Sequence, residues 1–176
     1  MTPPSRIAAV LAAGAASAAL TFPAAAGARA GDRTFQQTFP VASMVCAKVA
    51  AGTEGKHLKR FATQVTADCT ALQSTFTSAQ STVLTARTAI NAQIAAARAL
   101  TAAACPATTK TPTVACRHTR AVNDLAIDKL HRQMHHAVRR YYRTIEAARE
   151  RFWNAIHALP GERRVHEDLP IAQLPS

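Results

Sequence analysis

Apolar residues recur every three or four positions along residues 56–104, and this spacing predicts one long helix rather than strands. The segment contains neither glycine nor proline, so no residue in it is expected to interrupt the helix. At ~1.5 Å per residue such a helix would be about 70 Å long. Its apolar stripe would consist of Leu58, Phe61, Val65, Cys69, Leu72, Phe76, Ala79, Val83, Ala86, Ile90, Ile94 and Ala97.

A second segment without glycine or proline, residues 113–159, repeats this helical spacing. Pro106 and Pro112 lie between the two segments and mark a short connection. Because two helices of similar length joined by a short connection lie antiparallel, we predict an all-α, coiled-coil-like hairpin. The apolar stripe of its second helix would consist of Ile127, Leu130, Met134, Val138, Tyr141, Ile145, Ala148, Phe152, Ile156 and Leu159.

Shorter segments flank this hairpin. Residues 31–40 are mostly polar and end at a proline, which predicts an extended lead-in. Residues 41–51 have a helical composition and stop before Gly52, which predicts a short N-terminal helix. Residues 160–176 contain three prolines and are expected to form an extended C-terminal tail. The helical domain would therefore cover residues 41–159.

Residues 1–30 are typical of a Sec-type signal peptide. Arg6 provides a short positive region, and residues 7–22 form an uncharged, alanine-rich apolar run. Ala-Ala-Ala at 24–26 and Ala-Arg-Ala at 28–30 both match the small-residue pattern of a cleavage site. The alternative is an uncleaved membrane anchor, for which the apolar run is short. We therefore expect removal of this segment.

Removal would leave a mature chain that begins near Gly27 or Gly31 and has no further apolar stretch long enough to span a membrane. The protein is therefore expected to be secreted or associated with the cell envelope. Its alanine-, arginine- and threonine-rich composition hints at a bacterium with a GC-rich genome.

The chain has four cysteines, and in an exported protein these indicate two disulfides. A zinc site would need closely spaced cysteine pairs, which are absent from the sequence. Cys69 and Cys105 would lie about 54 Å apart on the first long helix, whereas bridged cysteines have Cα atoms within ~7 Å. Cys116 follows the short connection and lies near Cys105. The remaining pairing is Cys46–Cys69 with Cys105–Cys116.

The chain is strongly basic, with 21 Lys and Arg against 10 Asp and Glu and a net charge of +11. Loss of residues 1–30 removes Arg6 and Arg29, which leaves 19 basic against 10 acidic residues and a net charge of +9. An excess of positive charge favours anionic partners and says nothing about the fold.

Much of this charge clusters on one face of the second long helix, opposite its apolar stripe. Like charges four residues apart on a helix repel each other, and few acidic residues lie nearby to offset them. We interpret this face as a candidate binding surface for an anionic envelope polymer or lipid headgroups, the alternative being a solvated arginine-rich face without a ligand. Its members are Lys129, Arg132, His136, Arg139, Arg140 and Arg143.

Intracellular nucleic acid is a poor candidate partner, because export removes the protein from it and aromatic residues for base stacking are not interleaved with the cations.

The first long helix, in contrast to the second, carries few charged residues. Between Phe61 and Ala104 its only charged residues are Asp68, Arg87 and Arg98, amid Thr, Ser, Gln, Asn and Ala. This neutral surface is either a face for lateral packing or simply solvated.

The apolar stripe of the second helix would be roughly 140° wide at 100° per residue. One neighbouring helix covers less than that. Either the helix over 41–51 or a second copy of the protein must cover the remainder, so a homodimer with a four-helix arrangement is a hypothesis.

His131 and His135 stand four residues apart, a spacing at which two imidazoles can hold one transition metal. No carboxylate on this helix completes a site, and the metalloprotease pattern H-E-x-x-H is absent from the sequence. A solvated histidine pair is the alternative interpretation. Because the sequence also lacks a carboxylate pair, a nucleophile motif and a phosphate-binding glycine loop, we expect neither enzyme activity nor a cofactor.

These patterns favour an exported structural or binding protein that acts through the surface of a rigid rod. A small metal- or haem-binding module that uses the histidine pair is the second interpretation.

Overall fold

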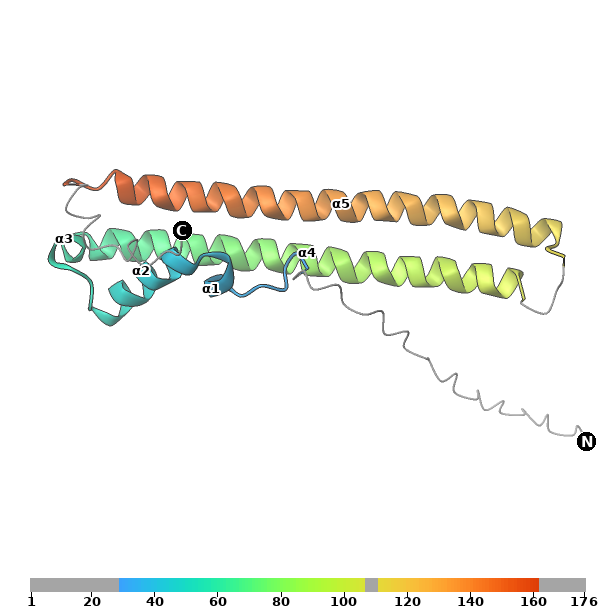
Figure 1. Cartoon of the computed structure of the whole chain (residues 1–176), viewed down its shortest axis with the longest axis horizontal. Helices are drawn as coiled ribbons and strands as arrows, with labels where there is room; N and C mark the ends of the chain where they lie inside the picture. The colour runs from blue at the N-terminus through green and yellow to red at the C-terminus, as the bar shows by residue number, and fades with distance from the viewer. Residues whose placement is uncertain (1–28, 107–110, 162–176) are drawn as a thin grey trace, which may run out of the picture.

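The computed structural model of the chain describes residues 29–106 and 111–161, and every described element is a helix. Two long antiparallel helices form a hairpin, and three short helices lie at its open end (Figure 1). In chain order the helices are α1 (Phe35–Thr38), α2 (Pro40–Ala51), α3 (Lys56–Lys59), α4 (Ala62–Ala104) and α5 (Val114–His157). The predicted signal peptide up to residue 28 and the tail from residue 162 lie outside the described residues.

The predicted all-α hairpin is confirmed, and the bounds of its second helix differ from the expected 113–159 by one or two residues. Thr113 precedes α5 in extended backbone, and its hydroxyl accepts a hydrogen bond from the Cys116 backbone N–H at 3.1 Å. This side chain satisfies one of the backbone donors that a helix start leaves without an intrahelical partner. Residue 113 is therefore the N-cap of α5.

The first long helix begins later than predicted. Residues 56–59 form the separate helix α3, and α4 starts only at Ala62. Phe61 has a φ of −113°, outside the helical range, and separates the two helices. Leu58 is only 1% exposed, so this break accompanies the burial of its side chain. Neither glycine nor proline marks the break, and the apolar spacing continues through it. The sequence therefore contains no signal that the helix is interrupted here.

The extended lead-in expected over 31–40 is also wrong in part, because α1 occupies its centre and Pro40 begins α2. The Thr34 hydroxyl accepts a hydrogen bond from the Gln37 backbone, and the Gln37 side chain accepts one from the Thr34 backbone. This reciprocal pair is a capping box, whose Thr-x-x-Gln pattern is visible in the sequence. Packing of the Phe35 and Phe39 rings against Phe76 holds the segment against α4.

Both predicted disulfides are present. Cys46–Cys69 joins α2 to α4 with a Cα–Cα distance of 5.7 Å. Cys105–Cys116 joins the end of α4 to the start of α5 with a Cα–Cα distance of 5.0 Å. Disulfides form and persist in oxidising compartments, so the two bridges indicate an extracellular or otherwise oxidising environment.

The hairpin has two halves with unequal cores. In the open-end half (residues 62–84 and 136–157), the short helices add buried side chains such as Phe39, Val45 and Leu58 to those of α4 and α5. In the tip half (residues 85–104 and 114–135), the second core cluster has only three buried members. They are Ile90, Ile94 and Leu130.

A polar contact supplements this small core, because the Asn123 side chain donates to the Ala97 carbonyl at 3.0 Å and to the Thr101 hydroxyl at 2.8 Å. Figure 1 shows the short helices beside the open-end half of α4 only. Among the described residues, no helix combines the length and the apolar character needed to cross a bilayer.

Candidate anion-binding face

The six basic side chains singled out from the sequence are all exposed on α5, and we call this surface the basic face. The buried residues Leu130, Tyr141 and Ile145 turn the opposite side of the helix inward. At 100° per residue, the basic positions then point away from the core. The basic face consists of Lys129, Arg132, His136, Arg139, Arg140 and Arg143.

Among the described residues, no acidic side chain forms an ion pair with the basic face. The ion pairs found there are Arg87–Asp32 and Arg149–Glu146, and neither includes a residue of the basic face. The five Lys and Arg side chains of the basic face therefore repel one another, and mainly solvent screens this repulsion. A polyanion laid along α5 would reduce this repulsion.

Next to the basic face, α4 and α5 enclose an open groove of about 800 Å³. Its α5 wall follows the i, i+3, i+4 spacing expected for one side of a helix. That wall consists of Gln133, His136, Ala137, Arg140, Tyr141 and Thr144. The α4 wall consists of Ser74, Thr75, Ser78, Ala79, Thr82, Val83 and Ala86.

The two walls of the groove differ in chemistry. The α4 wall carries four hydroxyl groups, and those of Thr75 and Thr82 donate to carbonyls one turn earlier in their own helix. A hydroxyl that donates in this way keeps lone pairs that can accept hydrogen bonds. The α5 wall contributes the Arg140 guanidinium, which can bind an anionic group with two parallel hydrogen bonds. The groove can thus contact hydroxyl and anionic groups of one ligand.

The structure divides the basic face into two parts. His136 and Arg140 line the groove itself. Arg132, Arg139 and Arg143 are spaced seven and four residues apart and lie on the exposed surface beyond the groove rim. A chain-like ligand in the groove would have these three arginines beside it. Lys129 lies one turn closer to the tip than Gln133 of the groove wall.

His131 and His135 are both exposed on α5, as their sequence positions suggest. In the part of the chain that the structure describes, no three His, Cys, Asp or Glu side chains gather into a group able to hold a metal ion. Among the described residues, the fold therefore brings no third metal ligand to His131 and His135.

Tyr141 and the hydroxyl wall of α4 are features of the site that sequence reasoning missed. Burial raises the pKa of Tyr141, with a smaller contribution from Tyr142, while hydrogen bonds to the Thr38 side chain and the Gly31 backbone oppose the shift. Tyr141 therefore contacts the N-terminal segment and also lines the groove. The unusually neutral Ser and Thr run of α4 was visible in the sequence, but which of its faces would lie beside the arginines was not.

Asp68 lies apart from the basic face, in a smaller cavity of about 230 Å³ that Arg151 and Phe152 also line. Its Oδ2 atom is buried and has no hydrogen-bond partner, and burial raises the pKa of this carboxyl group. Arg151 instead donates to the backbone carbonyl of Ala147. The Asp68 side chain is thus a local cost to stability rather than half of an ion pair.

No family model, curated protein or solved structure matches this chain. The basic face and the groove beside it are therefore the features that point to a function.

Proposed function

We propose that this protein is an exported binding protein of the cell envelope that holds an anionic polymer along α5. The observation that carries the proposal is the row of six exposed basic side chains, five of them Lys or Arg, without ion-pair partners among the described residues. Retaining such a row costs stability through like-charge repulsion of ~0.2–0.5 kcal/mol per neighbouring pair. Binding to a polyanion offsets this cost and gives the arginines a function.

The groove favours a polymer that carries hydroxyl as well as anionic groups. Arg140 supplies the charge contact, and the serine and threonine hydroxyls of α4 face it across the groove. Sugar- or polyol-phosphate chains of an envelope combine both kinds of group, whereas lipid headgroups present them at a flat surface. We therefore favour the polymer over the membrane surface as the ligand.

The proposed activity is binding, not catalysis. Among the described residues, the carboxyl group whose pKa is raised by burial is that of Asp68, which is in the smaller cavity and not in the groove. The four cysteines are all in disulfides and hence are not free nucleophiles.

The test is to measure binding of the disulfide-bonded protein to poly(glycerol phosphate) over a salt series, with phosphatidylglycerol vesicles as a second probe. Replacing exposed charge contacts costs about 0.2–1 kcal/mol each. Arg139→Ala/Arg143→Ala should therefore weaken polymer binding roughly tenfold at low salt. Affinity for the wild type should fall steeply as salt rises, because the interaction is electrostatic.

The matched control is Arg117→Ala/Arg120→Ala, which removes the same charge from two exposed positions of α5 near the tip, more than ~25 Å along the helix from Arg139 and roughly 90° and 150° around it from the mean direction of the basic face. The control should bind nearly as well as the wild type. Equal losses in both double variants would show a nonspecific charge effect. Preference for vesicles over the polymer would place the ligand at the membrane surface.

We also propose that the tip half mediates association with a second copy. Leu100 is 61% exposed and Val122 is 52% exposed. Leu100 lies five helical turns from Thr82, and Val122 lies two heptads before His136, so both continue the groove side of the hairpin toward the tip. A second copy over these side chains would complete a four-helix arrangement for the thin core of the tip half.

Sedimentation equilibrium tests this association. Leu100→Asp/Val122→Asp should shift the protein to monomer, whereas Tyr142→Asp should not, because Tyr142 is 53% exposed but lies in the open-end half and about 100° or more around α5 from the groove-lining residues Tyr141 and His136. A wild type that sediments only as monomer at high concentration would refute the association and leave the polymer proposal unaffected.

A further inference from the structure

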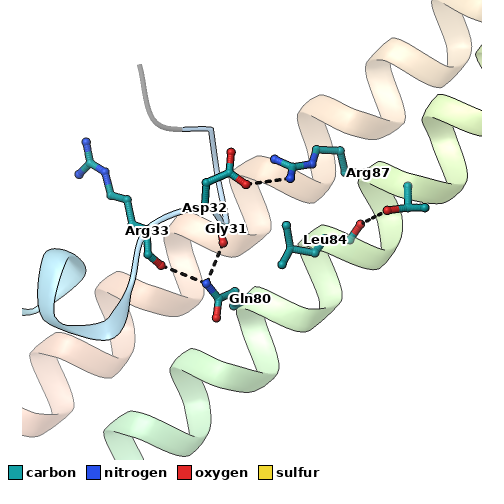
Figure 2. A network of polar contacts seen from close by, with 7 residues as sticks. Gly31, Asp32, Arg33, Gln80, Leu84 and Arg87 are labelled. Atoms are coloured by element: carbon teal, nitrogen blue, oxygen red, sulfur yellow. Dashed lines mark hydrogen bonds and ion pairs between the residues drawn. The ribbon is translucent and has the colours of Figure 1, made fainter. Parts of the chain in front are cut away.

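The residues just before α1 are built into the fold, and we call residues 29–33 the strap. Figure 2 shows this segment beside α4, with Gln80 and Arg87 reaching toward it. The Gln80 Nε2 atom donates to two strap carbonyls, Gly31 at 2.7 Å and Arg33 at 3.0 Å. One amide side chain thus holds the strap on both sides of Asp32.

An ion pair adds a second attachment. Arg87 donates to the Asp32 carboxylate at 2.7 Å, and Arg87 is one of only three charged residues between Phe61 and Ala104. The hydrogen bond from Arg87 lowers the pKa of Asp32, which keeps the carboxylate ionised. Gln80 and Arg87 are seven residues apart, two turns along the same side of α4.

Gly31 is buried beneath these contacts and requires glycine for two reasons. Its φ is +88°, a conformation that residues with a Cβ adopt only with strain. A Cβ at this position would also come within 2.8 Å of the Val83 side chain and 3.2 Å of Leu84. The backbone of the strap therefore lies directly against α4.

The fold also uses the two residues that precede Gly31. The Arg29 carbonyl accepts a hydrogen bond from the Asp32 backbone N–H at 3.0 Å, which closes a turn. Ala30 is partly buried and packs against the main core cluster. A chain that began at Gly31 would lose both contacts and would carry a charged α-ammonium group on a buried residue, which is unfavourable.

We propose that processing of this protein occurs after Ala26, so that the mature chain begins at Gly27 and keeps Arg29 and Ala30 in the strap. The inference rests on the export that forms part of the proposed function. Both candidate cleavage sites have small residues at the required positions, so the sequence does not choose between them. The contacts of Arg29 and Ala30 favour the first site, because cleavage there leaves residues 27–30 ahead of the buried glycine.

The test is to express the full chain in an exporting bacterial host and determine the N-terminal sequence of the processed protein. We expect Gly-Ala-Arg-Ala-Gly-Asp. Ala26→Phe places a bulky residue at the proposed cleavage position and should abolish the Gly27 terminus. Ala28→Phe is the matched control, because it disrupts only the second cleavage pattern and should leave the Gly27 terminus at the wild-type yield.

A processed chain that begins Gly-Asp-Arg-Thr, and whose processing is lost in Ala28→Phe but not in Ala26→Phe, would overturn the inference while export stands. Recovery of only the unprocessed chain with reduced cysteines would overturn the inference together with the proposed export. Binding of the polymer is measured separately, so its failure would not alter the N-terminal result.

Discussion

The open-end half and the tip half of the hairpin consist of the same two helices, yet different interactions hold them together. The open-end half has a third layer from the short helices, and Phe35, Phe39 and Phe76 form a cluster of rings within it. The tip half has three buried core residues and the Cys105–Cys116 disulfide. A pair of long helices is thus stabilised by packing at one end and largely by a covalent link at the other.

The two proposed functions also lie at different ends of the hairpin, with polymer binding at the open-end half and association with a second copy at the tip half. The groove of the basic face lies beside the well-packed half, where Tyr141 and Val83 are held by the strap on the other side. A binding surface for a polymer needs side chains at defined spacing, which a rigid core provides. Four exposed large apolar side chains lie instead in the thinly packed tip half, where the proposed second copy would add a layer; they are Leu100, Val114, Val122 and Leu125.

The largest expected effect comes from truncating the core of the open-end half. Phe76→Ala removes a buried ring that contacts two others and should lower the free energy of unfolding by about 3–5 kcal/mol. Ile94→Ala in the tip half should cost less, about 2 kcal/mol, because fewer neighbours surround the side chain. Urea denaturation of both variants measures the difference. Equal losses would mean that the two cores contribute alike.

Removing either disulfide should destabilise the protein by about 3 kcal/mol in the chain-entropy model, but in different places. Cys105→Ala/Cys116→Ala should increase amide hydrogen exchange across the tip half and leave the open-end half protected. Cys46→Ala/Cys69→Ala should instead increase exchange in α2. Uniform loss of protection in both variants would show that the hairpin opens as a single cooperative unit.

Replacing Gly31 in the strap should destabilise the protein. Gly31→Ala introduces both backbone strain and overlap with Val83, so it should lower the free energy of unfolding by about 2–3 kcal/mol. Gly52→Ala is the matched control, because Gly52 also has a positive φ but open space around its Cβ position. That variant should lose only about 1 kcal/mol. Similar losses would indicate that contact with α4 adds nothing to the strain.

The smallest expected effects concern the carboxyl groups of Asp32 and Asp68, whose pKa values are shifted in opposite directions. The pKa of Asp32 is lowered by its hydrogen bond with Arg87, so its stabilisation is complete above the ordinary carboxyl pKa and is lost as the pH falls through the lowered value. The pKa of Asp68 is raised by burial, so its ionised form destabilises the fold near neutral pH and this penalty disappears on acidification.

Asp32→Asn should therefore be slightly less stable than the wild type at pH 7, and Asp68→Asn slightly more stable. The Asp68→Asn difference should shrink as the pH falls toward about 4, whereas the Asp32→Asn difference should shrink only below about 4. Thermal unfolding at several pH values measures them. A destabilised Asp68→Asn at neutral pH would mean that the carboxylate has a favourable partner.

The spacing of apolar residues was sufficient to predict the hairpin and its disulfides. Helix periodicity over α4 and α5 depends on local geometry, and the rise of a helix places Cys69 too far from Cys105 for a bond. The same local reasoning missed the break at Phe61 and the helix α1. Both depend on side chains, Leu58 and Phe35, that fold against distant parts of the chain.

For the candidate site, the amino-acid sequence by itself identified the basic face, because charge on one side of a helix follows from residue number alone. Only the tertiary structure brought the serine and threonine hydroxyls of α4 opposite Arg140 and placed the strap against Gln80 and Arg87. Those contacts join residues about 50 to 70 positions apart in the chain, and their partners are chosen by the rotation and register of two packed helices. Helical periodicity determines which side of each helix is apolar, but the packing of those sides decides which polar groups meet.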